Sequence, residues 1–282
     1  MQLWHAIVLG IVEGITEYLP ISSTGHLIIA ASLMGLDDEA RKPAVDAFSI
    51  VIQGGAILAV LGLYRVRVWG MIRGVLGRDP AGLRLAINLV IAFIPAGVLG
   101  FLLDDWVEAR LFNPGAVMAA LALGGVYMLA VDRWSRSRPS VPPDGAPDGL
   151  AALRPDQALA IGLLQCVAMW PGTSRSMVTI TGGMLTGLRP AQAAEFSFLL
   201  GLPTLGGATV YKALKNTDEL ASLGTPAIVV GVLVAAVSAA AAIRWLVAFL
   251  NRRGLALFAW YRFALCAALL TLWLAGLVRF VP

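Results

Sequence analysis

Six segments of the chain are predominantly apolar, and each is long enough to cross the hydrocarbon core of a membrane as a helix. A core of about 30 Å needs roughly 20 helical residues. The six segments lie at 47–64, 84–103, 113–132, 192–211, 225–247 and 256–278. Backbone groups in lipid must be hydrogen-bonded within the segment or in a closed barrel, so runs of this length predict helices. With 59% hydrophobic and only 13% charged residues, we expect an all-α polytopic membrane protein.

Two further apolar stretches, 2–36 and 155–188, are interrupted near their middle, the first at Pro20 and the second at Pro171 and Gly172. Proline removes a backbone donor and clashes with the preceding turn, so it breaks a helix. Irregular backbone at membrane depth is tolerated where protein buries it or where it lines a cavity. We therefore expect two re-entrant helical hairpins, each entering and leaving on one face of the membrane.

Basic residues are concentrated in alternate connections between the spans. The richer connections contain twelve, namely Arg65, Arg67, Arg73, Arg78, Arg84, Arg133, Arg136, Arg138, Arg154, Arg244, Arg252 and Arg253, and the others contain five, namely Arg41, Lys42, Arg110, Lys212 and Lys215. The positive-inside tendency assigns the richer connections to the cytoplasm. That assignment requires both hairpins to return to their own side, the first opening outward and the second inward. It also explains the net charge of +4 without a nucleic-acid partner.

The alternation of arginine-rich connections, with hairpins that open to opposite sides, predicts an inverted-topology repeat within one membrane domain. The first repeat would be 1–136, with hairpin 2–36 and three spans, and the second 155–282, with hairpin 155–188 and three spans. A Pro-, Gly- and Asp-rich linker at 137–154 would join them. With one gap, Gly10, Glu13, Pro20, Ser22 and Ser23 align with Gly162, Gln165, Pro171, Thr173 and Ser174. In transporters, broken helices from two inverted repeats meet near the midplane and form the site there.

The N-terminal residues and the two cysteines give further expectations about this membrane protein. The first ten residues have no basic n-region, so we expect them to belong to the folded protein rather than to a cleaved signal peptide. Cys166 and Cys266 lie singly in apolar stretches, which argues against a disulfide framework or a metal-thiolate site.

The first polar interruption, residues 13–26 and hereafter the first elbow, reads EGITEYLPISSTGH. Ionisable side chains inside a membrane are costly and indicate a functional site. Glu13 and Glu17 are four residues apart, so on a helix they share one face. Ser22, Ser23 and Thr24 follow the break, Gly25 permits a sharp reversal of the chain, and His26 begins the next apolar run.

The second interruption, residues 171–179 and hereafter the second elbow, reads PGTSRSMVT. Arg175 offers a planar cationic fork among hydroxyl groups, which suits phosphate oxygens. A helix starting just after Thr173 would point its free amide groups at the same place. A divalent cation held by Glu13 and Glu17, together with an anion held by the cation and Arg175, would satisfy every member of the two elbows.

The paired motifs E-x-x-x-E-x-x-P-x-SSTGH and PG-x-SRS-x-x-T resemble those of the undecaprenyl-diphosphate phosphatase family, integral membrane enzymes linked to bacitracin resistance. The resemblance extends to the IQGGAIL run at Ile52, the EFSFLLGLP run at Glu195 and WYR at Trp260. Met177 departs from it, because the family usually has glycine there. The resemblance implies hydrolysis of undecaprenyl diphosphate to undecaprenyl phosphate, the lipid carrier of cell-wall synthesis, with Mg²⁺ or Ca²⁺ required. It places functional positions at Glu13, Glu17, Ser23, His26, Ser174, Arg175 and Thr179.

We assign Glu13 and Glu17 to the metal ion and Arg175 to the terminal phosphate. The nucleophile stays open: His26 could activate Ser23, attack phosphorus itself, or deprotonate a water. Further hydroxyls would bind the substrate, namely Ser22, Thr24, Ser174, Ser176 and Thr179. For Ser22, Thr24 and Ser176 the alternative is a structural one, since hydroxyls at a helix break often cap free amides. Gln165, Gln53 and Glu195 are expected to form interhelical hydrogen bonds.

A transporter or flippase of a lipid phosphate or another anion is the competing function, because inverted repeats with broken helices are a transporter design. It needs Arg175 and the carboxylates, but it has no use for Ser23 and His26 as an attacking pair. The enzyme is expected in the bacterial cytoplasmic membrane, among membrane lipids and a polyprenyl diphosphate substrate, with the site opening outward. Its oligomeric state, including a homodimer, stays open.

Overall fold

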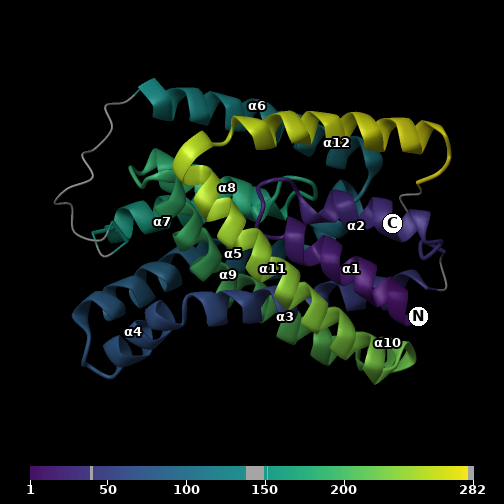
Figure 1. Ribbon diagram of the computed structural model, residues 1–282, viewed down its shortest axis with the longest axis horizontal. Helices are drawn as coiled ribbons and strands as arrows, with labels where there is room; N and C mark the ends of the chain where they lie inside the picture. The colour runs from purple at the N-terminus through teal and green to yellow at the C-terminus, as the bar shows by residue number, and fades with distance from the viewer. Residues whose placement is uncertain (39–40, 138–148, 151, 279–282) are drawn as a thin grey trace.

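The computed structural model describes residues 1–38, 41–137, 149–150 and 152–278, which contain helices and no strand. Figure 1 shows the arrangement. The elements are α1 (Leu3–Thr16), α2 (Ser23–Leu33), α3 (Lys42–Leu63), α4 (Arg65–Val75), α5 (Pro80–Leu111), α6 (Pro114–Ser137), α7 (Pro155–Gln165), the 3₁₀ turn η1 (Cys166–Met169), α8 (Arg175–Leu185), α9 (Pro190–Lys215), α10 (Thr217–Leu223), α11 (Thr225–Arg253) and α12 (Ala256–Leu274).

The prediction of six membrane-spanning helices is confirmed. In the described part of the chain, six helices are long and apolar enough to cross a membrane, namely α3, α5, α6, α9, α11 and α12. Most begin or end a few residues beyond the predicted limits, because polar residues such as Arg133 and Asn251 continue the helix past the apolar run. The protein is therefore a multi-pass helical membrane protein.

The two interrupted stretches form pairs of short helices, as predicted. Helix α1 has 14 residues, and α2, α7 and α8 have 11 each. At 1.5 Å per residue these helices are about 21 or 16 Å long, short of a core of about 30 Å. Helices of this length favour re-entrant insertion from opposite faces of the membrane. That insertion and the inverted repeat remain predictions. The predicted linker at 137–154 lies mostly outside the described residues.

Both elbows turn on a serine in a backbone conformation that L-residues rarely adopt. Ser22 has φ 75° and ψ 101°, and Ser174 has φ 73° and ψ 113°; each immediately precedes the second helix of its pair. The expectation that Gly25 reverses the chain was wrong, because Gly25 is helical and lies against α12, where a Cβ atom would meet Leu265. The backbone also pairs Ser22 with Ser174, one residue away from the predicted alignment of Ser22 with Thr173.

The first helix of each pair packs on a long helix of the opposite half of the sequence. Helix α1 lies beside α11, as Figure 1 shows, and α7 packs against α5. Glycine permits both approaches: a Cβ atom at Gly10 would lie 2.7 Å from the Gly231 carbonyl oxygen, and one at Gly162 would collide with Ala92 backbone. Small residues at such crossings are typical of membrane helices, where close van der Waals packing replaces the hydrophobic effect.

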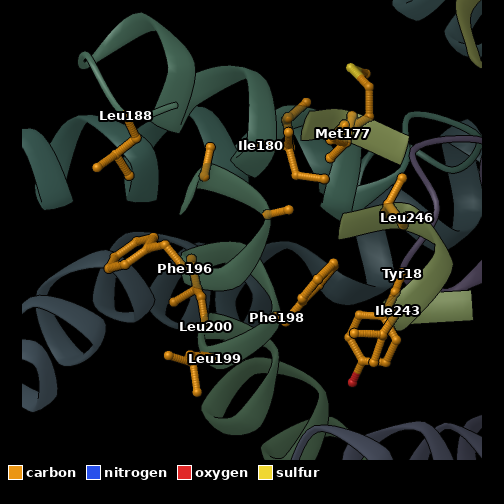
Figure 2. Close-up of a cluster of buried hydrophobic side chains, with 14 of the residues drawn as sticks. Tyr18, Met177, Ile180, Leu188, Phe196, Phe198, Leu199, Leu200, Ile243 and Leu246 are labelled. Atoms are coloured by element: carbon orange, nitrogen blue, oxygen red, sulfur yellow. The ribbon is translucent and has the colours of Figure 1, made fainter. Parts of the chain in front are cut away.

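The largest apolar cluster surrounds the second elbow and reaches the first. Figure 2 shows side chains of α8 and α9, including Met177, Ile180, Phe196 and Phe198, together with Tyr18 of the first elbow. The rings of Tyr18 and Phe198 meet edge to face with centroids 5.2 Å apart. Met177 is buried in this cluster, so the departure from the family pattern leaves the elbow closely packed.

Helices α4 and α10 were not predicted. Helix α4 lies in the arginine-rich connection, and Arg67 on it forms an ion pair with Glu195 of α9 at 2.8 Å. This contact makes Glu195 an interhelical partner, as expected. Helix α10 has only seven residues, too few to show a periodic pattern.

Candidate active site

An ion pair joins the two elbows. Arg175 Nη2 donates to Glu17 Oε1 at 2.8 Å, and both side chains are about nine-tenths buried. Arg175 Nη1 donates to the Ser197 carbonyl at 2.9 Å, and the guanidinium lies 5.4 Å from the centre of the Tyr18 ring. Removing one member of a buried pair leaves an uncompensated charge, which is strongly unfavourable. The predicted meeting of the acidic and basic elbows is therefore present in the fold.

A serine side chain of the second elbow is also hydrogen-bonded to the backbone of the first. Ser176 Oγ donates to the Leu19 carbonyl at 2.9 Å and lies 3.0 Å from Ser174 Oγ. Ser174 caps α8, because its Oγ accepts from the Met177 amide at 3.3 Å. Ser176 and Ser174 therefore stabilise the join of the elbows in this structure, which is the structural alternative raised above for Ser176.

The other hydroxyl groups differ in what they contact. Thr179 Oγ1 donates to the Arg175 carbonyl at 2.8 Å and lies 2.6 Å from Ser197 Oγ, so it braces α8 on α9. Ser22 Oγ is buried and has no hydrogen-bond partner among the residues described. Thr24 is half-buried in the first turn of α2. Of the predicted substrate-binding hydroxyls, Ser22 is the one whose buried oxygen is left over for a ligand.

Ser23 and His26 are bound to different groups rather than to each other. Ser23 Oγ donates to Glu17 Oε2 at 3.0 Å. His26 Nδ1 lies 2.7 Å from the Ser22 carbonyl oxygen, and His26 Nε2 lies 2.7 Å from the Tyr261 hydroxyl. The carboxylate of Glu17 thus contacts both Arg175 and Ser23, through one oxygen each.

Glu13 differs from Glu17 in its hydrogen bonding. Its side chain is fully buried, and neither carboxylate oxygen has a hydrogen-bond partner within the described part of the chain. The amide of Gln165, at the position aligned with Glu13, is buried and also has no partner among the described residues, so the interhelical hydrogen bond expected of it is not formed there. A buried carboxylate without a partner is costly unless something binds it. The two carboxylates Glu13 and Glu17, the second of which contacts Arg175, fit a hard divalent cation with an anion beside it.

Several contacts of the site were missed by sequence reasoning. Tyr18 and Ser197 contact Arg175, and Tyr261 contacts His26. Arg262 is fully buried and donates to four backbone carbonyls, two on α6 at Ala120 and Leu121 and two in the second elbow at Gly172 and Thr173, at 2.9 to 3.2 Å. The sequence feature that could have indicated Tyr261 and Arg262 is the WYR run, because it places a tyrosine and an arginine inside an apolar span.

Comparison with known proteins agrees with this geometry. The family model described as bacitracin resistance protein BacA matches residues 6–268. A protein of Sorangium cellulosum named undecaprenyl-diphosphatase is 48% identical over 276 residues, covering 97% of this chain and 87% of the relative. Relatives with the same name from Azotobacter vinelandii and Pseudomonas putida are 45% and 43% identical, and each alignment covers 99% of this chain and 98% of the relative. The chain therefore belongs to the BacA family of bacitracin resistance proteins.

Proposed function

We propose that the protein hydrolyses undecaprenyl diphosphate to undecaprenyl phosphate and inorganic phosphate, the activity named for its relatives. The observation that carries this function is the contact of Glu17 with both Arg175 and Ser23, which gathers a phosphate-binding cation, a carboxylate and a hydroxyl at one point. Hydrolysis of a phosphoanhydride depends mainly on positioning and electrostatic stabilisation, and these groups supply both.

Arg175 binds the terminal phosphate in this proposal. Its two terminal nitrogens are held by Glu17 and the Ser197 carbonyl, while its Nε is buried and has no partner among the described residues. That N–H is a donor for a phosphate oxygen. The buried Oγ of Ser22, which also has no partner there, is a second polar group for the substrate.

Glu13 and Glu17 would hold a divalent cation, Mg²⁺ or Ca²⁺. The unpartnered oxygens of Glu13 support this, because a cation would satisfy them. Among the described residues no group of three or more His, Cys, Asp or Glu side chains is arranged to hold a metal ion, so substrate oxygens and water would complete the coordination. When bound, such a cation supplies charge neutralisation for the phosphoanhydride.

Ser23 is the proposed nucleophile. Its hydroxyl is already oriented by Glu17, which can accept the proton as the Oγ–P bond forms and the bond to the bridging oxygen breaks. The leaving group is undecaprenyl phosphate, and water then hydrolyses the phosphoserine to release phosphate and restore the hydroxyl. His26 is not bonded to Ser23 in this structure, so its role is the later activation of that water.

We further propose that the protein lies in the bacterial cytoplasmic membrane with the site opening to the outer side. The arginine-rich connections and the short helices of both elbows support two hairpins inserted from opposite faces. The diphosphate would then be hydrolysed on the non-cytoplasmic side.

Phosphate release by the purified protein in detergent tests the function, because no membrane is present to be crossed. We expect undecaprenyl phosphate and inorganic phosphate in equal amounts. Intact undecaprenyl diphosphate after prolonged incubation with Mg²⁺ or Ca²⁺ would contradict hydrolysis and favour transport. The names of the relatives favour the hydrolase.

A further inference from the structure

His26 is fixed at both nitrogens of its ring. Nδ1 lies 2.7 Å from the Ser22 carbonyl oxygen, and Nε2 lies 2.7 Å from the hydroxyl of Tyr261, which belongs to α12 at the other end of the chain. The two rings are nearly parallel, with planes 7° apart and centroids separated by 5.6 Å. The imidazole therefore has little rotational freedom.

These two partners determine where the imidazole proton lies. A carbonyl oxygen only accepts hydrogen bonds, so Nδ1 must carry a proton to bond to Ser22. In the neutral ring Nε2 is then the acceptor, and the Tyr261 hydroxyl donates to it. In the charged ring Nε2 donates, and the same hydroxyl accepts. Tyr261 is thus a partner for Nε2 in either protonation state, and Nε2 is the nitrogen that can exchange a proton.

Tyr261 lies on α12, a helix that the neighbouring Arg262 anchors to other parts of the protein. The next residue, Arg262, is fully buried and its donors bind carbonyls of α6 and of the second elbow, including Gly172 and Thr173 at 2.9 and 3.0 Å. Consecutive residues of α12 therefore contact the two elbows, Tyr261 the first and Arg262 the second. Groups held on packed helices keep a site in register better than groups on loops.

We propose that Tyr261 is a positioning residue for His26, holding the imidazole in its orientation through Nε2 while the Ser22 carbonyl fixes the tautomer through Nδ1. This inference rests on the proposed function, because it concerns the histidine of that site. Tyr261 is 44% exposed, and the hydrogen bond lost with its hydroxyl is the one to Nε2 of the half-buried His26. The phenol is therefore needed for the geometry of His26 more than for the packing of α12.

Kinetics of Tyr261→Phe provide the first test, because phenylalanine keeps the ring contact and removes the hydrogen bond. We expect kcat for phosphate release to fall about tenfold with KM unchanged, the size usual for a group that orients a reacting side chain. Trp260→Phe, at the exposed neighbouring position, and Tyr211→Phe, at an exposed tyrosine of α9, are matched controls that keep wild-type kcat. A Tyr261→Phe enzyme within twofold of wild type would overturn the proposal.

Nitrogen NMR of the two histidines provides a second test that needs no activity. The chain contains two histidines, His5 and His26, and His5 Nδ1 accepts from the backbone N–H of Gln2 at 3.3 Å, so in the neutral ring its proton is on Nε2. Imidazole-¹⁵N spectra of neutral rings should show opposite tautomers, assigned with His5→Gln. In Tyr261→Phe the Nε2 resonance of His26 should shift while both His5 resonances stay. An Nε2 resonance of His26 that is unaffected by Tyr261→Phe would refute the positioning role even if wild-type protein releases phosphate. A wild-type protein without phosphatase activity would instead refute the proposed function.

Discussion

Ser22 and Ser174 share one unusual backbone conformation, with φ of 75° and 73°, at corresponding points of two elbows that lie in different halves of the chain. They are the two non-glycine residues with positive φ in the described part of the structure. Such conformations cost about 1 to 3 kcal/mol and persist where the surrounding fold imposes them, often at functional sites. Because the same conformation occurs at both elbows, we infer that the two bends have related roles in the site.

Substitution of Ser22 separates the backbone strain from the hydroxyl. Ser22→Gly relieves the strain, whereas Ser22→Ala keeps it, and both remove the buried Oγ. Glycine loses more conformational entropy on folding than alanine does, but the strain that it relieves is larger. We therefore expect the glycine variant to be more stable than the alanine variant by about 1 kcal/mol. Thermal unfolding in detergent measures this difference. Both variants should release phosphate more slowly than wild type; equal stability of the two would show that the bend is unstrained.

Ser23→Ala distinguishes a serine nucleophile from a water. If Ser23 attacks, the alanine variant should lose at least about 10³-fold in kcat, since the covalent route is closed. Rapid quenching of wild type with ³²P-labelled diphosphate should also trap label on Ser23. Ser32→Ala, which removes a half-buried serine hydroxyl near the other end of α2, is the control and should retain most activity. A Ser23→Ala enzyme with near-normal turnover would assign the attack to water.

Glu13→Gln tests the cation site. Chelation of divalent ions should abolish phosphate release, and Mg²⁺ or Ca²⁺ should restore it. In Glu13→Gln we expect the half-saturating cation concentration to rise at least about tenfold, because a charged oxygen ligand is lost. Asp156→Asn changes an exposed carboxylate outside the elbows and should leave the cation requirement unchanged. Full activity of wild type in the presence of chelator would remove the cation from the proposal.

Cysteine labelling tests the orientation of the hairpins. Cys166 and Cys266 are replaced first, and single cysteines are then placed at Arg41 and, separately, at Arg78. A membrane-impermeant maleimide added to intact cells should label the Arg41 position, and it should label the Arg78 position only after permeabilisation. The reverse pattern would invert the topology. Labelling of both positions from one side would show that the segment between them, which contains α3, does not cross the membrane.

The sequence predicted the spans and the two breaks because both are local properties. A run of about 20 apolar residues or a proline in mid-helix acts within its own segment. The contact of Glu17 with Arg175 was also predictable, since a buried acid and a buried base need each other.

The remaining contacts depend on tertiary packing. His26 and Tyr261 are far apart in sequence, and neither has a local signal that names the other as a partner. The pairing of Ser23 with Glu17 instead of His26 follows from the turn at Ser22, whose backbone conformation no composition rule would assign to serine. Helix α4 was missed because its arginines made it look like a connection.

The claim that Glu17 and Arg175 form the reaction centre is tested most directly by the phosphate-release rates of Glu17→Ala and Arg175→Ala in detergent. Size-exclusion profiles like that of wild type would establish that each variant is folded. We predict that kcat/KM falls at least about 10³-fold in each and that the double variant is little worse than either single one, because residues acting as a unit are not additive. Near-normal turnover in either single variant would contradict the account.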